Sequence, residues 1–340
     1  MPEVSVIMPV YNAEASVEKT LDALASQTLD SMEIIAIDDG SQDATGQILD
    51  SYALKCPRLQ VIHTPNQGIY RARLEGIGRA KGEYLAFCDA DDLPSATMYE
   101  ELLMALKNNC AQMSVCGYVR EEAATGKVLA TEMTSFGDIV VSTAENMDIL
   151  PVINTAVWNK MFRADAVRDI LHYEEPPRVM EDMMFCCASY PNIARIAFIA
   201  KPLYRYLVHP RSAMAHVDPQ EISLLQKCMI ETRNAVAQKG EGYARICDTM
   251  AFIHFGLSAV LRRVQGGEDT AKVVREAESY LNKYHPHWKQ AGRSLVWNLK
   301  NGNILLKPLL ARYIYQLHLM RPFLWAYRFV TEKLKIDIKW

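Results

Sequence analysis

In the N-terminal third of the chain, short apolar runs alternate with segments whose apolar residues recur at helical spacing. Strands that alternate with helices at such short intervals are typical of βαβ units. The pattern therefore predicts an α/β fold with a doubly wound, mostly parallel sheet and helices on both of its faces. Pro9 is expected to interrupt the first strand. The predicted strands lie within residues 4–12, 33–41, 59–63 and 82–88, and the predicted helices within residues 16–26 and 45–54.

Carboxylates follow two of these predicted strands directly. Asp89, Asp91 and Asp92 come after the apolar run that begins at Gly82, and Asp38 and Asp39 come after the run from 33 to 37. Because parallel strands end at one edge of the sheet, where open α/β folds bind their ligands, the two acidic groups are expected to share a site. Crowded acids repel one another unless a positive charge compensates, and a hard divalent cation is the usual partner.

Two common phosphate-binding motifs are missing from the sequence. No Gly-x-Gly-x-x-Gly follows the first strand, and no Gly-x-x-x-x-Gly-Lys-Ser/Thr occurs in the chain. A bound diphosphate would therefore have to be held by a metal ion and basic side chains.

Four segments in order, residues 4–12, 38–45, 66–73 and 82–92, resemble the motifs of the family 2 glycosyltransferases of the GT-A fold, of the type found in bacterial polysaccharide biosynthesis. The resemblance covers about the first 120 residues. Trp158-Asn159-Lys160 and the segment from Glu181 to Phe185 resemble two downstream elements of the family. One departure is Leu74, where the family usually has Asn.

The resemblance implies inverting transfer of a sugar from a nucleotide-sugar donor, with uridine favoured as the base, to an acceptor hydroxyl. Asp182 would be the general base, and Asp91 the main ligand of Mg²⁺ or Mn²⁺ with Asp89 beside it. The implied donor-binding residues are Pro9, Tyr11 and Asp39 around the base, Arg71 and Arg73 near the ribose or phosphates, and Asp89 at the ribose or the sugar, together with Asn12 and Asp91.

Elementary chemistry agrees with these implied roles. Negative charge develops on the diphosphate as the glycosidic bond breaks, and a divalent cation stabilises it as a Lewis acid. The acceptor hydroxyl needs a proton acceptor, and a positioned carboxylate contributes on the order of 10²–10⁴ in rate.

A further group is assigned to acceptor or phosphate contact, and three of its members have a structural alternative. Trp158 is either a platform for an acceptor sugar or a core residue, and Glu181 is either a site residue or the partner of an arginine. His209 is either a metal or diphosphate ligand or part of a surface loop. The whole group comprises Trp158, Lys160, Glu181, His209 and Arg211.

Composition indicates an ordinary globular enzyme. Half of the 340 residues are apolar, and the eight cysteines show no Cys-x-x-Cys spacing, which favours reduced, buried thiols in a cytoplasmic protein. The first strand begins at residue 4, so no signal peptide is expected. The most apolar stretch, residues 246–261, contains Asp248 and His254 and is predicted to be a packed helix.

The charge is distributed unevenly. Residues 285–340 hold ten basic and two acidic residues, whereas the rest of the chain holds 27 basic and 38 acidic ones. This segment is also aromatic, which favours contact with an anionic membrane on its cytoplasmic face, although a solvated helical subdomain would look the same. No nucleic-acid-binding motif accompanies the charge, so no nucleic-acid partner is expected.

The chain is therefore divided into a donor-binding half at residues 1–120, an acceptor-binding half with the base at 121–215, and a helical region at 216–340. The predicted function is metal-dependent transfer of a sugar to a lipid-linked or growing cell-surface glycan. The alternatives are a sugar-phosphate nucleotidyltransferase, for which the Gly-rich basic loop after the first strand is missing, and a non-catalytic sugar-nucleotide-binding protein.

Overall fold

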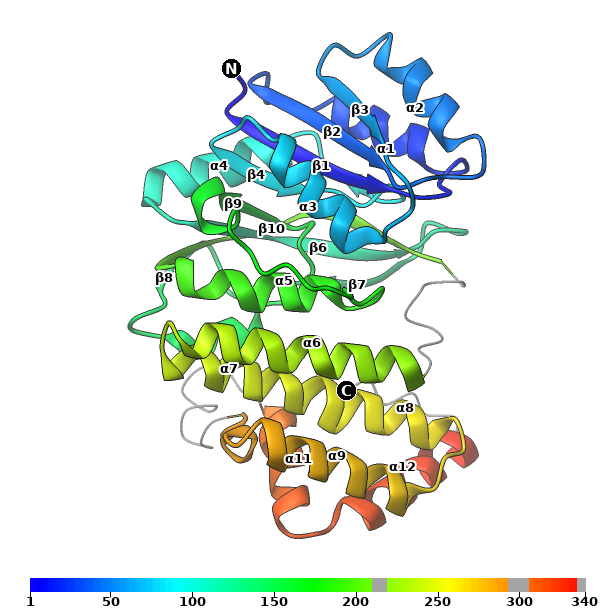
Figure 1. Ribbon diagram of the computed structural model, residues 1–340, viewed down its shortest axis with the longest axis vertical. Coiled ribbons are helices and arrows are strands. Elements are labelled where there is room, and N and C mark those ends of the chain that lie inside the picture. Colours follow the sequence, from blue (N-terminus) through cyan, green and yellow to red (C-terminus); the bar gives the residue numbers. More distant parts are fainter. Residues whose placement is uncertain (210–218, 293–305, 335–340) are drawn as a thin grey trace. The chain divides into compact units, whose positions relative to one another are not determined.

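The computed structural model describes residues 1–209, 219–292 and 306–334 (Figure 1). The chain forms two compact units, one made of residues 1–147 and 153–228 and the other of residues 148–152 and 229–340. Apart from residues 148–152, both halves predicted for donor and acceptor binding belong to the first unit. The last boundary between the units along the chain lies within a helix, between Cys228 and Met229.

A ten-stranded, mostly parallel sheet forms the centre of the first unit, as predicted. Four parallel strands come first, and an antiparallel strand joins them to a second parallel pair. The strand order is β3 (Leu59–His63), β2 (Met32–Asp38), β1 (Val4–Val10), β4 (Tyr84–Phe87), β9 (Lys160–Arg163), β6 (Met113–Glu122), β10 (Arg195–Val208) and β5 (Leu93–Pro94). Two further strands, β7 (Val128–Glu132) and β8 (Val140–Ser142), pair with β6 and β10.

Helices cover both faces of this sheet. One core joins Val4, Val6 and Met8 of β1 to apolar side chains of α1 (Val17–Ala25), α2 (Thr45–Ala53) and α4 (Met98–Asn109). On the opposite face lie α3 (Ile69–Arg79) and α5 (Glu181–Ser189). There Gly76 of α3 approaches Ile7 so closely that an added Cβ would lie 2.3 Å from its Cγ2, and Phe185 of α5 packs edge-on against Phe87 with ring centroids 5.2 Å apart.

The expectation that Pro9 breaks the first strand is wrong, because β1 runs through Pro9 to Val10. The carbonyl of Ile7 accepts from the amide of Cys88, so the alternation of the strand points the nitrogen of Pro9 to the same side. β4 has already ended at Phe87 on that side. The missing N–H of proline therefore removes no ladder hydrogen bond.

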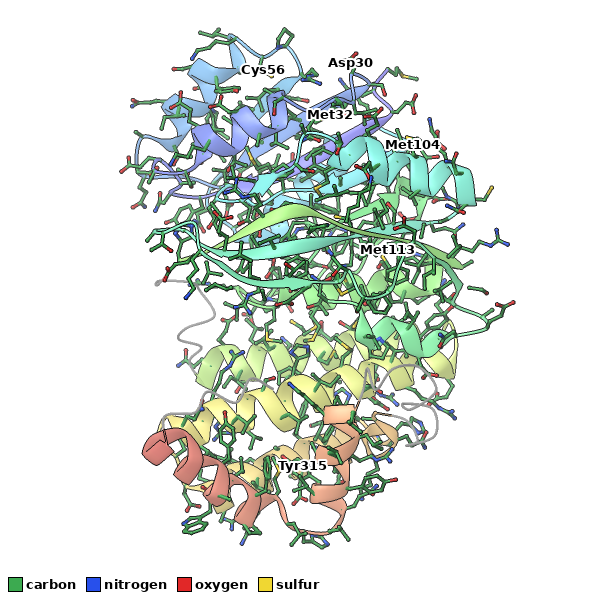
Figure 2. All side chains as sticks on the ribbon, turned by 180° about the vertical axis from the view of Figure 1, so that it is seen from behind. Asp30, Met32, Cys56, Met104, Met113 and Tyr315 are labelled. Carbon is green, nitrogen blue, oxygen red and sulfur yellow. The ribbon has the colours of Figure 1, made fainter. Side chains whose placement is uncertain are left out.

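The described part of the second unit is helical. It contains the end of α6 (Pro219–Ala237), a continuous run made of α7 (Glu241–Ala251), a π-helical turn (Phe252–Ser258) and α8 (Ala259–Gln265), then α9 (Thr270–Tyr284), α11 (Leu306–Gln316) and α12 (Met320–Leu334). Phe252 lies at its centre and contacts the rings of Trp288 and Tyr315, at 5.3 and 5.8 Å between centroids. Figure 2 shows Tyr315 among these helices.

The run Glu241–Gln265 is long and apolar enough to cross a membrane, by length and composition alone. Of its most apolar window, 67% is buried in the structure. This burial agrees with the prediction of a packed helix. All eight cysteines are free thiols, and seven are buried; Cys110 is the exposed one.

Candidate active site

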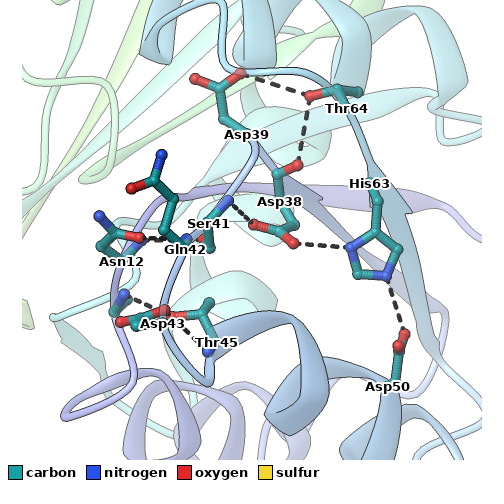
Figure 3. A network of polar contacts seen from close by, with 11 residues as sticks. Asn12, Asp38, Asp39, Ser41, Gln42, Asp43, Thr45, Asp50, His63 and Thr64 are labelled. Carbon is teal, nitrogen blue, oxygen red and sulfur yellow. Dashed lines mark hydrogen bonds and ion pairs between the residues drawn. The ribbon is translucent and has the colours of Figure 1, made fainter.

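The loops that follow β1 and β2 are joined by hydrogen bonds at the carboxyl edge of the sheet (Figure 3). The side chain of Asn12 accepts from the amide of Gln42 at 2.8 Å, and the amide of Asn12 donates to the hydroxyl of Ser41 at 3.0 Å. Asn12 adopts a left-handed backbone with φ of 48°, as asparagine does most readily among residues with a side chain. Of the two residues before it that are predicted to bind the base, Pro9 is buried in β1 and Tyr11 is 49% exposed.

Asp39 connects the loop after β2 to the start of α3. Its two carboxylate oxygens accept from the amides of Gln67 and Gly68, each at 2.8 Å. Gly40, with φ of 73°, permits the close approach, because a Cβ there would lie 2.7 Å from the Asn66 nitrogen. Asp39 is 3% exposed, so it organises this loop, and its contact with a nucleotide base remains a prediction.

His63 at the end of β3 stabilises the same loop and was not expected from the sequence. Its Nδ1 lies 2.8 Å from Asp38 and its Nε2 lies 3.1 Å from Asp50 of α2, as Figure 3 shows. Burial alone would raise the pKa of Asp38, but hydrogen bonds from Ser41 and His63 hold it below its usual range. The hydrogen bonds to Asp38 and Asp50 raise the pKa of His63 in turn. An alternating strand that ends in histidine carries no signal for this role.

The three acids that follow β4 have different environments. Asp92 is fully buried and accepts from the amide of Leu207 in β10 at 2.8 Å. Asp91 is half exposed. Burial raises the pKa of Asp89 to about 7, against the lowering effect of Arg73 and with a further increase from Asp91. The amide of Asp89 donates to the hydroxyl of Tyr204, a buried residue of β10 that sequence reasoning also missed.

Asp92 brings the end of β10 beside the acids. His209 follows Leu207 by two residues, and its Nε2 lies 3.7 Å from a carboxylate oxygen of Asp91. This nitrogen is buried and has no hydrogen-bond partner among the residues that the structure describes. An orphaned imidazole nitrogen beside a carboxylate fits a shared divalent cation. No group of three or more His, Cys, Asp or Glu within residues 1–209, 219–292 and 306–334 is arranged to hold a metal, so any ion here needs ligands from substrate or water.

Arg73 of α3 is 2% exposed and donates from Nη1 to Oε1 of Glu181 at 2.9 Å. Of the two alternatives for Glu181, the structure supports an arginine partner. The same guanidinium interacts with the charges of Asp89 and Asp182. α3, the end of β4 and the start of α5 therefore meet in one electrostatic cluster: Arg73, Asp89, Glu181 and Asp182.

Asp182 lies in the first turn of α5, where the helix N-terminus favours negative charge. Burial nonetheless raises its pKa to about 7, Glu181 raises it further, and Arg73 opposes both effects. A carboxylate whose pKa lies near neutrality is matched to general-base chemistry. The base assignment itself remains a prediction.

The remaining predicted residues lie in the core or in loops. Trp158 is 7% exposed and stacks on Tyr204, with centroids 4.5 Å apart, so its placement fits the core alternative. The ammonium group of the fully buried Lys160 donates to oxygens of Asn154, Ala156 and Asn159 and thereby shapes that loop. Burial lowers its pKa to about 8.

Arg71 is exposed and donates to the carbonyl of Glu174 at 2.6 Å. Arg211 lies outside the described residues. Donor, acceptor and phosphate contacts of Arg71, Trp158, Lys160 and Arg211 stay predictions.

Comparison with known proteins decides the family. Residues 5–171 match glycosyl transferase family 2. The chain belongs to this family. A relative in Bacillus subtilis (strain 168), the uncharacterized glycosyltransferase EpsJ, is 30% identical over 218 residues, which cover 62% of this chain. That match spans 63% of the relative, less than two thirds of its length.

Two solved structures share the fold of this family 2 chain. S. aureus TarS 1–349 in complex with UDP-GlcNAc superimposes with a TM-score of 0.70 at 21% identity, covering 94% of this chain and 92% of that one. The mannosyltransferase PcManGT from Pyrobaculum calidifontis, in complex with GDP-Man and Mn²⁺, has a TM-score of 0.51 at 16% identity, with 93% and 87% covered. The predicted GT-A fold is thus confirmed.

Proposed function

We propose that this protein is an inverting, metal-dependent glycosyltransferase that moves a sugar from a UDP-sugar to an acceptor hydroxyl. The observation that carries the proposal is the cluster of Asp89, Arg73 and Asp182 at the meeting point of three elements. A pure sugar-nucleotide-binding protein needs the acids after β4 but has no use for a near-neutral carboxylate at the start of α5.

In the proposed reaction, the acceptor oxygen attacks the anomeric carbon while its proton passes to a carboxylate oxygen of Asp182. The bond between the anomeric carbon and the β-phosphate oxygen breaks, and the nucleoside diphosphate leaves with the electron pair. Arg73 is tied to Glu181 and buried beside Asp182, so its charge keeps the base ionised for part of the population at neutral pH.

Asp91 and His209 would hold the divalent ion, with Asp89 as a further ligand. When bound, the ion neutralises charge on the leaving diphosphate. Two or three protein ligands suffice, since Mg²⁺ and similar ions keep water and phosphate oxygens in their coordination shell. The Mn²⁺ in the complex of the mannosyltransferase PcManGT, which shares the fold, supports this assignment.

The donor preference rests on Asp39 and on the relative of known structure. Asp39 retains lone pairs beyond its two backbone contacts and could accept from the imide of uracil. S. aureus TarS, which has the same fold, binds UDP-GlcNAc. For the acceptor we propose a lipid-linked or growing glycan of cell-surface or exopolysaccharide biosynthesis, used by an enzyme on the cytoplasmic face of the cell membrane.

A donor screen tests the proposed function. The full chain is incubated with Mn²⁺ and a panel of UDP-sugars, and release of UDP is measured with and without a lipid extract as the source of acceptor. We expect turnover with at least one UDP-sugar, and loss of turnover in Asp182→Asn with retained UDP binding. Binding without turnover of any donor would favour the non-catalytic alternative, and formation of UDP-sugar from UTP and a sugar phosphate would favour the nucleotidyltransferase.

A further inference from the structure

Helix α11, which lies in the basic end of the chain, exposes apolar side chains along one face. Leu310 and Tyr313 of α11 are 50% and 44% exposed, and Leu317, the residue directly after the helix, is 65% exposed. The amide of Leu317 donates to the carbonyl of Tyr313 at 2.9 Å, which continues the helical bonding, so the spacing of three and four residues places the three side chains on a single face. The opposite face is fixed inside the second unit, where Tyr315 is buried and donates to the carbonyl of Gly256 at 2.6 Å. The exposed face therefore cannot turn inward without breaking that packing.

Two more large apolar side chains are exposed in the turn before the next helix, α12, and in α12 itself. Leu319, in the turn before α12, is 49% exposed, and Trp325 of α12 is 72% exposed. α11 and α12 contact each other within the second unit. Single exposed leucines are normal on a protein surface, but five large apolar side chains exposed within sixteen residues favour an interaction site.

Charge identifies the kind of partner. Lys307 and Arg321, both exposed, lie one turn before Leu310 and Trp325 respectively. The segment from 285 to 340 carries ten basic and two acidic residues, part of it outside the described residues. A second copy of the chain would bring the same positive charge to this surface, so electrostatics opposes a symmetric dimer here. An anionic partner is favoured.

The side chains match one anionic partner best. Leucine side chains become buried when a helix lies in the interface of a lipid bilayer, and tryptophan prefers that interface. Lysine and arginine beside them are attracted to anionic headgroups. We propose that α11 and α12 bind the surface of an anionic lipid bilayer. The residues proposed to make this contact are Lys307, Leu310, Tyr313, Leu317, Arg321 and Trp325.

Vesicle co-sedimentation of the full chain tests the proposal. Sucrose-loaded vesicles of equal parts phosphatidylglycerol and phosphatidylcholine are compared with vesicles of phosphatidylcholine alone, at low and high salt. We expect binding to the anionic vesicles, weakened by salt, and a ~10-fold or greater loss of binding in Leu310→Ser/Leu317→Ser/Trp325→Ser. A second variant, Lys307→Glu/Arg321→Glu, keeps the apolar residues and should also lose binding.

The first unit offers a matched control. Leu54 and Met104, which are 90% and 53% exposed, are changed to serine in Leu54→Ser/Met104→Ser, which should bind as the unchanged chain does. Circular dichroism establishes that every variant is folded.

Absence of binding to anionic vesicles, equal binding to both vesicle types, or equal loss in the control would overturn the proposal. So would light scattering that reveals a dimer abolished by the triple serine variant. UDP binding is measured on the same samples, so failure of the membrane contact is distinguishable from failure of the proposed function.

Discussion

Arg73 donates from its Nη1 to Oε1 of Glu181 at 2.9 Å, and both side chains are almost fully buried. The pair joins α3, which begins where Asp39 accepts from backbone amides, to α5, whose first turn holds the proposed base. The loop predicted to bind the nucleotide is therefore connected to Asp182 through two buried charges.

Removing one member of this pair should destabilise the fold strongly. Glu181→Ala leaves a buried guanidinium without its partner, and the expected loss in the free energy of unfolding is about 3–5 kcal/mol. Urea unfolding measures it. The matched control is Glu75→Ala, which breaks the exposed pair of Glu75 with Arg79 on the same helix as Arg73 and should cost less than about 1 kcal/mol. Equal losses in the two variants would contradict the role given to Arg73 and Glu181.

The strands, the helices and the carboxyl-edge acids could be predicted because they follow from local pattern. Apolar runs and helical spacing are visible in the sequence, and parallel strands must end at a common edge. The pairing of Arg73 with Glu181 could be stated only as an alternative, because 108 positions separate the two residues and only the tertiary fold brings them together.

Tyr204 and His63 were missed for a related reason. Both lie in strands, where a single polar or aromatic residue is common. Their roles depend on contacts with residues at the ends of other strands, namely Asp89 for Tyr204 and Asp38 for His63. Pro9 was misjudged because the rule against proline in a central strand depends on where the neighbouring strand ends, which the sequence does not reveal.

Asp182→Asn should abolish transfer while leaving UDP binding intact. Loss of a general base is expected to lower kcat by on the order of 10²–10⁴, because an amide cannot take the proton of the acceptor hydroxyl. The control is Asp165→Asn, which affects an exposed ion pair with Arg163. Full turnover in Asp182→Asn would show that another group is the base.

Because the pKa of Asp182 is raised, we expect the rate of sugar transfer to depend on pH. The pKa of Asp182 is raised to about 7, and only the ionised form accepts a proton. Transfer activity at saturating donor should therefore rise tenfold per pH unit below about pH 7 and become level above it. A profile that is already level between pH 5 and pH 7 would contradict the raised pKa.

His63 should stabilise the fold more in mild acid than in base. Its pKa in the folded state is raised by Asp38 and Asp50, so its contribution is fully present below its ordinary pKa and is lost as pH rises through the raised value. The difference in stability between the unchanged chain and His63→Gln should thus be larger at pH 6 than at pH 9. A difference of the same size at both pH values would contradict the contribution assigned to His63.

In the second unit, the buried carboxylate of Asp248 accepts from Arg233 at 2.6 Å and lies 3.0 Å from Nδ1 of His285. Asp248→Ala removes the shared partner of both groups and should cost about 3–5 kcal/mol, measured by thermal and urea unfolding. Glu241→Ala, which removes an exposed partner of His287, should cost less than about 1 kcal/mol. A mild effect of Asp248→Ala would mean that Arg233 and His285 find water or other partners.

Calorimetric titration with UDP, in Mn²⁺ and in EDTA, tests the central claim most directly. The claim is that the acids after β4 and His209 form one metal-dependent donor site, since Nε2 of His209 lies 3.7 Å from Asp91. We predict that UDP binds in Mn²⁺, that EDTA abolishes binding, and that Asp91→Ala and His209→Ala each weaken it strongly. UDP binding that is equally tight in EDTA, or unchanged in both variants, would contradict the account.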